Sequence, residues 1–251
     1  MPSNRDHAIV LRWHLLGESD RIVTLLTRSH GKIRAVAKGV RKTTSRIGSR
    51  LEPFTLVDVQ WAEGKSLAIV QQVELQASYG MALSTDYDAY ASAAAMVETA
   101  DKLTEHEAST EQFLLLVGGL KALAEKQHEV SLIADSYLLR ALSLAGWTPS
   151  VRDCAQTGAP GPHRHFVPAL GGVVAKEVAP PGSATLTEGT AQLLDALLHG
   201  EWSVADASDH KARQEASGLV QAYVQFHLER GLRALGEVSR VRREQREEVG
   251  K

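Results

Sequence analysis

Eight basic side chains lie between residues 28 and 50, with no acidic residue among them. Lysine and arginine at this density can bind phosphate, especially where hydroxyl groups and exposed backbone N–H groups accompany them. The Gly, Thr and Ser residues of the same stretch supply those groups. Such contacts hold a nucleic-acid backbone without reading its sequence. This basic segment contains Arg28, Lys32, Arg34, Lys38, Arg41, Lys42, Arg46 and Arg50.

The spacing of the basic segment predicts a strand followed by a loop. Side chains of a strand alternate between its two faces, so a strand over residues 32–38 would separate a basic face from an apolar one. The basic face would hold Lys32, Arg34 and Lys38, and the core face Ile33, Ala35 and Ala37. The loop would carry Arg41, Lys42 and Arg46, with Arg50 beyond it. The alternative is a solvated surface, although such surfaces normally mix charges of both signs.

Aromatic residues that could stack on bases are sparse in this part of the chain. The candidates are Trp13, Phe54 and Trp61. Each lies in an apolar strand pattern, which is more typical of a core residue than of a stacking platform.

The elements that must position the basic segment form two groups. Five short β-rich stretches precede residue 80, at residues 7–13, 20–27, 32–38, 53–61 and 66–75. They predict a small barrel of OB-fold size, although their number alone does not exclude an SH3-like barrel. Apolar residues then recur at helical spacing over residues 87–103, 111–126, 130–145, 187–198 and 217–235. The sequence therefore predicts an α+β protein.

The charge distribution supports separate parts. Residues 1–82 hold 12 basic and 7 acidic residues, whereas residues 83–251 hold 16 and 23. We predict an OB-fold DNA-binding domain over residues 1–82 and a helical domain over 83–146 and 184–251. Residues 147–183, rich in Pro and Gly, would form an insert.

The remaining composition limits the class of protein. One cysteine excludes an intramolecular disulfide and fits a reducing cytosol, so we expect a cytoplasmic protein. No stretch approaches the roughly 18 apolar residues of a membrane helix, and the N-terminus does not resemble a signal peptide.

Catalytic and metal-binding signatures are weak. The chain has no phosphate-binding loop, dinucleotide fingerprint, zinc-protease motif or nucleophile elbow, so we expect no enzyme. Cys154 with His163 is weak support for a thiol nucleophile. Cys154, His163 and His165 are the nearest approach to a metal-ligand set, with Asp153 a poor fourth.

Several motifs resemble the RecO family. Residues 31–54 contain its K-G-x-R, Ser-Arg and L-x-P-F elements, and residues 16–27 resemble its first hairpin. Residues 154–163, 171–174 and 180–182 are similar to its metal-bearing insert. The similarity covers nearly the whole chain and preserves the order of the motifs.

The resemblance implies an OB-fold, a helical domain and a zinc-ribbon-like insert. It also implies binding to single- and double-stranded DNA, annealing of complementary strands, and loading of recombinase onto DNA covered by single-strand-binding protein. RecR and the acidic tail of the single-strand-binding protein would be partners.

The insert departs from the family pattern. Many members carry two C-x-x-C pairs, but here residues 154–157 retain one cysteine and residues 175–178 retain none. A structural zinc site needs four ligands, so we expect no cofactor and an insert that has lost most of its metal ligands. Packing would then hold its shape, through Phe166, Val167, Leu170, Val173 and Val174.

Two functional hypotheses remain open from the sequence. One is a DNA-binding recombination mediator. The other is a protein-interaction adaptor of the repair machinery, with the barrel as a docking module and DNA binding incidental. A metal-dependent enzyme built on the insert is a distant third, against which the missing ligands argue.

Overall fold

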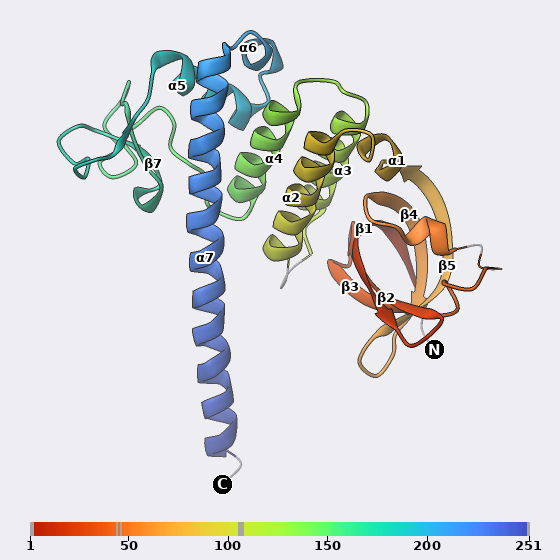
Figure 1. The fold of residues 1–251 in the computed structure, drawn as a ribbon. Helices are drawn as coiled ribbons and strands as arrows, with labels where there is room; N and C mark the ends of the chain where they lie inside the picture. Colours follow the sequence, from red (N-terminus) through yellow and green to blue (C-terminus); the bar gives the residue numbers. More distant parts are fainter. Residues whose placement is uncertain (1–2, 44, 46, 105–107, 250–251) are drawn as a thin grey trace. The chain divides into compact units, whose positions relative to one another are not determined.

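The structure is a computed structural model (Figure 1). It describes residues 3–43, 45, 47–104 and 108–249, with side chains up to residue 229. The chain divides into two compact units, residues 1–145 and 146–251, and each is described by itself.

The first unit begins with a closed five-stranded barrel. Its strands are β1 (Ser3–Leu16), β2 (Asp20–Thr27), β3 (Lys32–Ala37), β4 (Thr55–Ala62) and β5 (Ala68–Ser78). They close in the order β1-β2-β3-β5-β4, with β3 and β5 parallel and the other pairs antiparallel. A short 3-10 turn, η1 (Gly48–Leu51), lies between β3 and β4. This architecture confirms the predicted OB-fold class.

Alternation along the strands fills the barrel core. Ala35 and Ala37 are fully buried and Ile33 packs against the same cluster, as the spacing of the third strand predicted. Trp61 is 1% exposed within this core, surrounded by Val, Leu and Ala side chains from the other strands. Hydrogen bonds between neighbouring strands of the closed wall and apolar packing in the interior therefore both stabilise the barrel.

Four helices complete the first unit: α1 (Gly80–Leu83), α2 (Tyr87–Leu103), α3 (Thr110–Ala124) and α4 (Val130–Leu144). Asp86 caps α2 by accepting from the N–H groups of Asp88 and Ala89, and Ser109 caps α3 through the N–H of Gln112. These side chains satisfy backbone donors that the first turn of a helix leaves unpaired. The predicted range of α2 is confirmed at both ends, whereas four-residue α1 is too short to show a helical period.

The second unit contains a small sheet and three helices. The strands β6 (His165–Val167), β7 (Gly172–Val174) and β8 (Ala184–Thr185) pair in the order β7-β6-β8, and η2 (Pro168–Leu170) separates the first two. The helices are α5 (Glu188–His199), α6 (Trp202–Asp206) and α7 (His210–Val249). α7 begins seven residues earlier than predicted, where Asp209 accepts the N–H of Ala212.

The insert predicted over residues 147–183 has more regular structure than its composition suggested. It holds most of the three-stranded sheet, in which Phe166, Val173 and Val174 are buried. Phe166 packs edge-on against Tyr223 of α7, with ring centroids 5.9 Å apart. Val167 and Leu170 are only half-buried. The boundaries of the three predicted domains stay predictions.

Among the described residues, no helix combines the length and the hydropathy that crossing a bilayer requires.

Candidate nucleic-acid interface

The outer face of β1, β2 and β3 carries three residues at one register. Arg12 on β1 lies opposite Thr24 on β2, and Thr24 lies opposite Arg34 on β3. Directly opposed residues point to the same face of a sheet. That face is the outer one, because Val23 and Leu25 belong to the barrel core. OB-folds bind oligonucleotides on the face formed by strands 2 and 3, and Arg34 lies on that face. Arg12 lies on the adjoining β1, and Thr24 between the two is fully buried.

The loop after β3 extends this charge. Arg34, Lys38, Arg41 and Lys42 are all exposed. The loop is anchored to the β1–β2 turn, because the N–H of Arg41 donates to the carbonyl of Ser19 at 3.0 Å. The Arg41 guanidinium also donates to the carbonyl oxygens of Gly17 and Glu18, at 3.3 and 2.9 Å. Arg41 therefore fixes the loop as well as adding charge.

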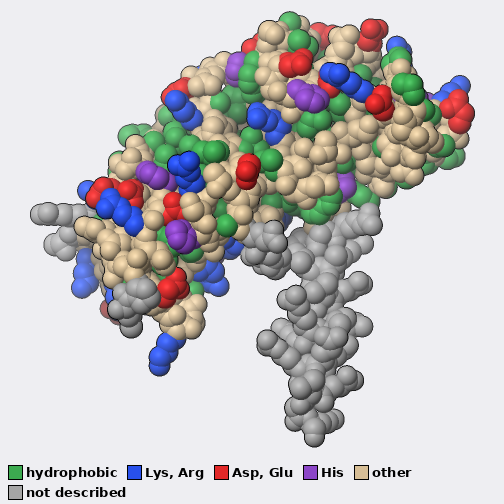
Figure 2. All heavy atoms as spheres, turned by 180° about the vertical axis from the view of Figure 1, so that it is seen from behind, with side chains coloured by type: hydrophobic (Ala, Val, Ile, Leu, Met, Phe, Trp, Pro, Cys, Tyr) green, Lys and Arg blue, Asp and Glu red, His purple; other side chains and the backbone are tan. Residues whose placement is uncertain are grey.

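One acid lies within the basic loop in space, although none lies there in sequence. The carboxylate of Asp20 accepts the N–H of Gly39 at 2.8 Å, and Gly39 has a φ of +65° that favours glycine. The pKa of Asp20 is lowered, first by this backbone N–H, then by the Ser19 hydroxyl, with Lys38 and Lys42 adding to the effect. Over the face in Figure 2, Lys and Arg side chains likewise lie among Asp and Glu side chains.

Two predicted site residues are engaged inside the protein. Lys32 is only 14% exposed, and its Nζ donates to the carbonyl oxygen and the Oδ1 of Asp101, at 2.7 and 2.9 Å. The Nη1 of Arg50 donates to the carbonyl of Val73 at 2.8 Å. Both side chains therefore support the fold where they lie. Arg46 falls outside the described residues.

Two of the three aromatic candidates are buried, and the third is partly buried. Trp61 and Phe54 are 1% and 5% exposed, so neither offers a free face to a base. Trp13 is partly buried against the barrel core, and the Arg21 guanidinium lies 3.9 Å from the centre of its ring. Glu52 holds this pair together, since it accepts from the indole N–H at 3.0 Å and from Arg21 at 2.7 Å.

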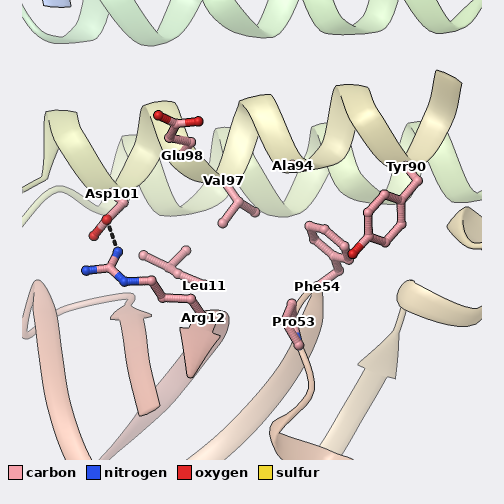
Figure 3. Close-up of a pocket in the computed structure, with 9 residues that line it drawn as sticks. All are labelled: Leu11, Arg12, Pro53, Phe54, Tyr90, Ala94, Val97, Glu98 and Asp101. Carbon is pink, nitrogen blue, oxygen red and sulfur yellow. Dashed lines mark hydrogen bonds and ion pairs between the residues drawn. The ribbon is translucent and has the colours of Figure 1, made fainter. Parts of the chain in front are cut away.

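A groove of roughly 270 Å³ separates the outer face of β1 from α2 (Figure 3). Its apolar end is formed by Phe54 and Tyr90, whose rings meet edge-on with centroids 5.4 Å apart. At its polar end the Arg12 guanidinium points toward α2 and pairs with Asp101.

Family comparisons cover both parts of the chain. The family model described as "Recombination protein O N terminal" matches residues 1–79, and that described as "Recombination protein O C terminal" matches residues 84–236.

The chain belongs to the RecO family of DNA repair proteins.

Curated relatives agree over almost the full length. Proteins named "DNA repair protein RecO" from Nocardioides sp. and Thermobifida fusca are each 52% identical to it, over 94% of this chain and 99% and 98% of their own. The protein of the same name from Streptomyces avermitilis is 50% identical, over 92% of this chain and 96% of its own. The family resemblance inferred from the motifs is confirmed.

Sequence reasoning missed two residues on the exposed face of this RecO-family barrel. Arg12 and His14 flank Trp13 on β1, and His14 lies opposite Ile22 at the next outward position. Their alternation with the partly buried Trp13 would have placed both on the outer face. The Arg12 pairing with Asp101 had no such signal, because the two residues are 89 positions apart.

The RecO-type insert holds its single cysteine without a metal-ligand set. Cys154 is 2% exposed, and its Sγ accepts the N–H of Ala175 at 3.3 Å. The Thr157 hydroxyl and the Ala175 N–H lower the pKa of Cys154 to about 6, against the opposing effect of burial. His163 bonds instead to the carbonyl of Ala159 at 3.0 Å, and His165 lies on β6. Within the part of the chain that the structure describes, no three His, Cys, Asp or Glu side chains are grouped to hold a metal ion.

Proposed function

We propose that this RecO-family protein is a DNA-binding recombination mediator. It binds single- and double-stranded DNA through the barrel, anneals complementary strands, and helps to load recombinase onto DNA covered by single-strand-binding protein. RecR and the acidic tail of the single-strand-binding protein are its proposed partners, and the cytoplasmic nucleoid its proposed location.

The observation that carries the proposal is the exposed basic surface formed by Arg34, Lys38, Arg41 and Lys42 on and after β3. Cations that neutralise backbone phosphates release condensed counterions, which drives binding and makes it sensitive to salt. Thr43 and Ser49 add exposed hydroxyl groups to the same segment. The family, whose members are named for DNA repair, supports DNA as the ligand.

Annealing on such a surface requires no covalent step. Two strands repel each other through their phosphates, and a surface that neutralises both backbones allows their bases to pair. We therefore propose a protein that acts by binding and not by catalysis.

The test is a fluorescence-anisotropy titration against single- and double-stranded DNA at two salt concentrations. It compares the wild type with a variant carrying Arg34→Glu, Lys38→Glu and Lys42→Glu. Arg41 is left in place, because its guanidinium holds the β1–β2 turn. Losing three phosphate contacts should weaken binding on the order of 100-fold and flatten the salt dependence by about two to three ions.

The matched control reverses the charge of Lys121, Lys126 and Lys211, which are exposed and lie outside the barrel. It changes the net charge equally and should alter affinity only a few-fold. Equal losses in both variants would mean that overall charge, and not the basic surface, controls binding. Wild-type protein that captures a repair protein yet binds no DNA at physiological salt would favour the adaptor function instead.

The proposed partners need a separate measurement. Annealing of complementary strands coated with single-strand-binding protein should depend on the acidic tail of that protein, and RecR should change the rate of recombinase loading. Equal annealing with tail-less single-strand-binding protein would contradict the first partner.

A further inference from the structure

Asp101 joins α2 to the barrel by bonding two of its basic side chains. It lies in the last turn of α2 and is 18% exposed. Its Oδ2 pairs with the Arg12 guanidinium, and its Oδ1 and its carbonyl oxygen accept from Lys32. Two cations of the outer barrel face are therefore directed toward α2.

Arg12 lies at the same register as Arg34, the residue of the basic surface that lies on β3. The two lie one strand apart on either side of Thr24. Neighbouring strands are about 4.8 Å apart, so the two backbones are roughly 10 Å apart. Arg12 is also 43% exposed, so its guanidinium is accessible to an outside ligand. Thr24 between them is fully buried, so a nucleic-acid backbone that spans the two positions would contact the exposed guanidinium groups of Arg34 and Arg12 and not the strand between them.

The contacts of Arg12 and Lys32 differ in one respect. For Arg12, Asp101 is the only bonded acid that the described residues supply, and the pair stands at the open polar end of the groove in Figure 3. Lys32 also bonds the helix carbonyl of Asp101, a contact that does not depend on the carboxylate charge. Neutralising Asp101 would thus release Arg12 while that bond to Lys32 persists.

We propose that Asp101 limits the DNA affinity of the barrel by competing with backbone phosphate for Arg12. The inference rests on the proposed function, since it concerns the same surface. The pair is partly exposed, at 43% for Arg12 and 18% for Asp101, so water screens the attraction between them. A phosphate offers the guanidinium the same paired hydrogen bonds as a carboxylate. Asp101 therefore determines whether Arg12 is available to bind a DNA phosphate.

The test is Asp101→Asn in the full chain, titrated against single-stranded DNA at several salt concentrations. Freeing one arginine should tighten binding about 3- to 10-fold and steepen the salt dependence by about one ion. The matched control is Glu98→Gln, which removes the same charge from the same groove, where Glu98 pairs with Lys102 and not with Arg12. It should change affinity less than about twofold, because it acts only through the general field.

A double-mutant cycle isolates Arg12. Arg12→Gln alone should cost less than about twofold, since Asp101 already occupies that side chain, whereas Arg12→Gln added to Asp101→Asn should abolish the gain. Equal gains from Asp101→Asn and Glu98→Gln, or a gain that survives in the double variant, would overturn the inference. So would a large loss from Arg12→Gln alone, because Arg12 would then already be bound to DNA.

The outcomes separate this inference from the proposed function. If the triple reversal on the basic surface abolishes binding but Asp101→Asn leaves it unchanged, the function stands and the inference fails. If the triple reversal has no effect, the basic surface itself is wrong. Thermal unfolding followed by circular dichroism establishes that each variant is folded. Should Asp101→Asn unfold, Asp101→Ser, which removes the same charge, takes its place in the titration and in the double-mutant cycle.

Discussion

The loop after β3 and the insert between α4 and α5 both match family motifs, and the structure treats their functional side chains differently. In the loop, Lys38 and Lys42 are exposed and lie near the carboxylate of Asp20. In the insert, Cys154 is buried and its sulfur already has a backbone donor. The basic side chains of the loop are accessible to an outside ligand, whereas the sulfur of the insert is already bonded within the protein.

The backbone of the insert forms its own hydrogen bonds around Cys154. The N–H of Cys154 donates to Ala159 at 2.9 Å, that of Gly158 to Cys154 at 2.8 Å, and that of Ala155 to Val173 at 2.8 Å. These bonds and the packing of Phe166 stabilise the insert. In the barrel, the closed ladder fixes the shape, and in the loop after β3 the exposed side chains of Lys38 and Lys42 remain accessible.

Trp61→Ala should have the largest effect, because it tests whether the barrel depends on its core. The side chain is 1% exposed in the barrel interior, and its loss should lower the free energy of unfolding by about 4 kcal/mol. Urea unfolding followed by circular dichroism measures the change. Leu75→Ala is the control, since Leu75 is 50% exposed on β5 and should cost under about 1 kcal/mol. Equal costs for the two variants would contradict a core-held barrel.

Phe166→Ala tests the insert in the same way. Phe166 is 2% exposed and packs on Tyr223, so its loss should cost about 3 kcal/mol in the same measurement. Treating the wild type with a chelator should leave the unfolding curve unchanged, because packing and not metal would hold the insert. Stoichiometric zinc in purified protein, or a marked shift with the chelator, would show that the comparison between loop and insert is wrong.

Local signals made much of this fold predictable. The ranges of β2 and α2 agree at both ends because each combines a clear period with a turn or capping residue, such as Asp86 before α2. The alternation of β3 correctly placed Ala35 and Ala37 in the core. The short strands of the insert were missed because three residues cannot show a period.

The candidate site was predictable in composition but not in pairing. Asp20 lies beside the basic loop through its bond to Gly39. Asp101 bonds Arg12, 89 positions away, and Lys32, 69 positions away. No local pattern reports such contacts. The sequence therefore identified where positive charge lies, but not which of those charges the fold already uses.

Arg50→Met sharpens the distinction between structural and ligand-binding cations. The change leaves the carbonyl of Val73 without its donor, so the free energy of unfolding should fall by about 1 kcal/mol. DNA affinity should stay within about twofold, because that guanidinium already bonds the barrel. The control is Lys42→Met, which removes an exposed cation and should do the reverse: unchanged stability and a salt dependence flatter by about one ion. If Arg50→Met lowered the DNA affinity and Lys42→Met did not, Arg50 would belong to the DNA-binding surface.

Cys154 predicts a pH dependence that arises within the insert. Its pKa in the folded protein is about 6, below the ordinary value of 9, so the unfolded chain binds more protons between these values. The stabilisation is therefore complete above pH 9 and is lost as the pH falls through about 6. Melting temperatures measured from pH 6 to 9 should rise more steeply for the wild type than for Cys154→Ala.

Thr157→Val provides the control for the cause of that shift, because the Thr157 hydroxyl is the largest contributor to it. Its removal should raise the pKa of Cys154 and narrow the pH range over which stability changes. The pH dependence of the rate at which the thiol is alkylated under mild denaturant would measure this change. If Cys154→Ala and the wild type have parallel pH profiles, the backbone N–H groups around the sulfur do not stabilise a thiolate. The stability of the insert would then not depend on ionisation of this sulfur.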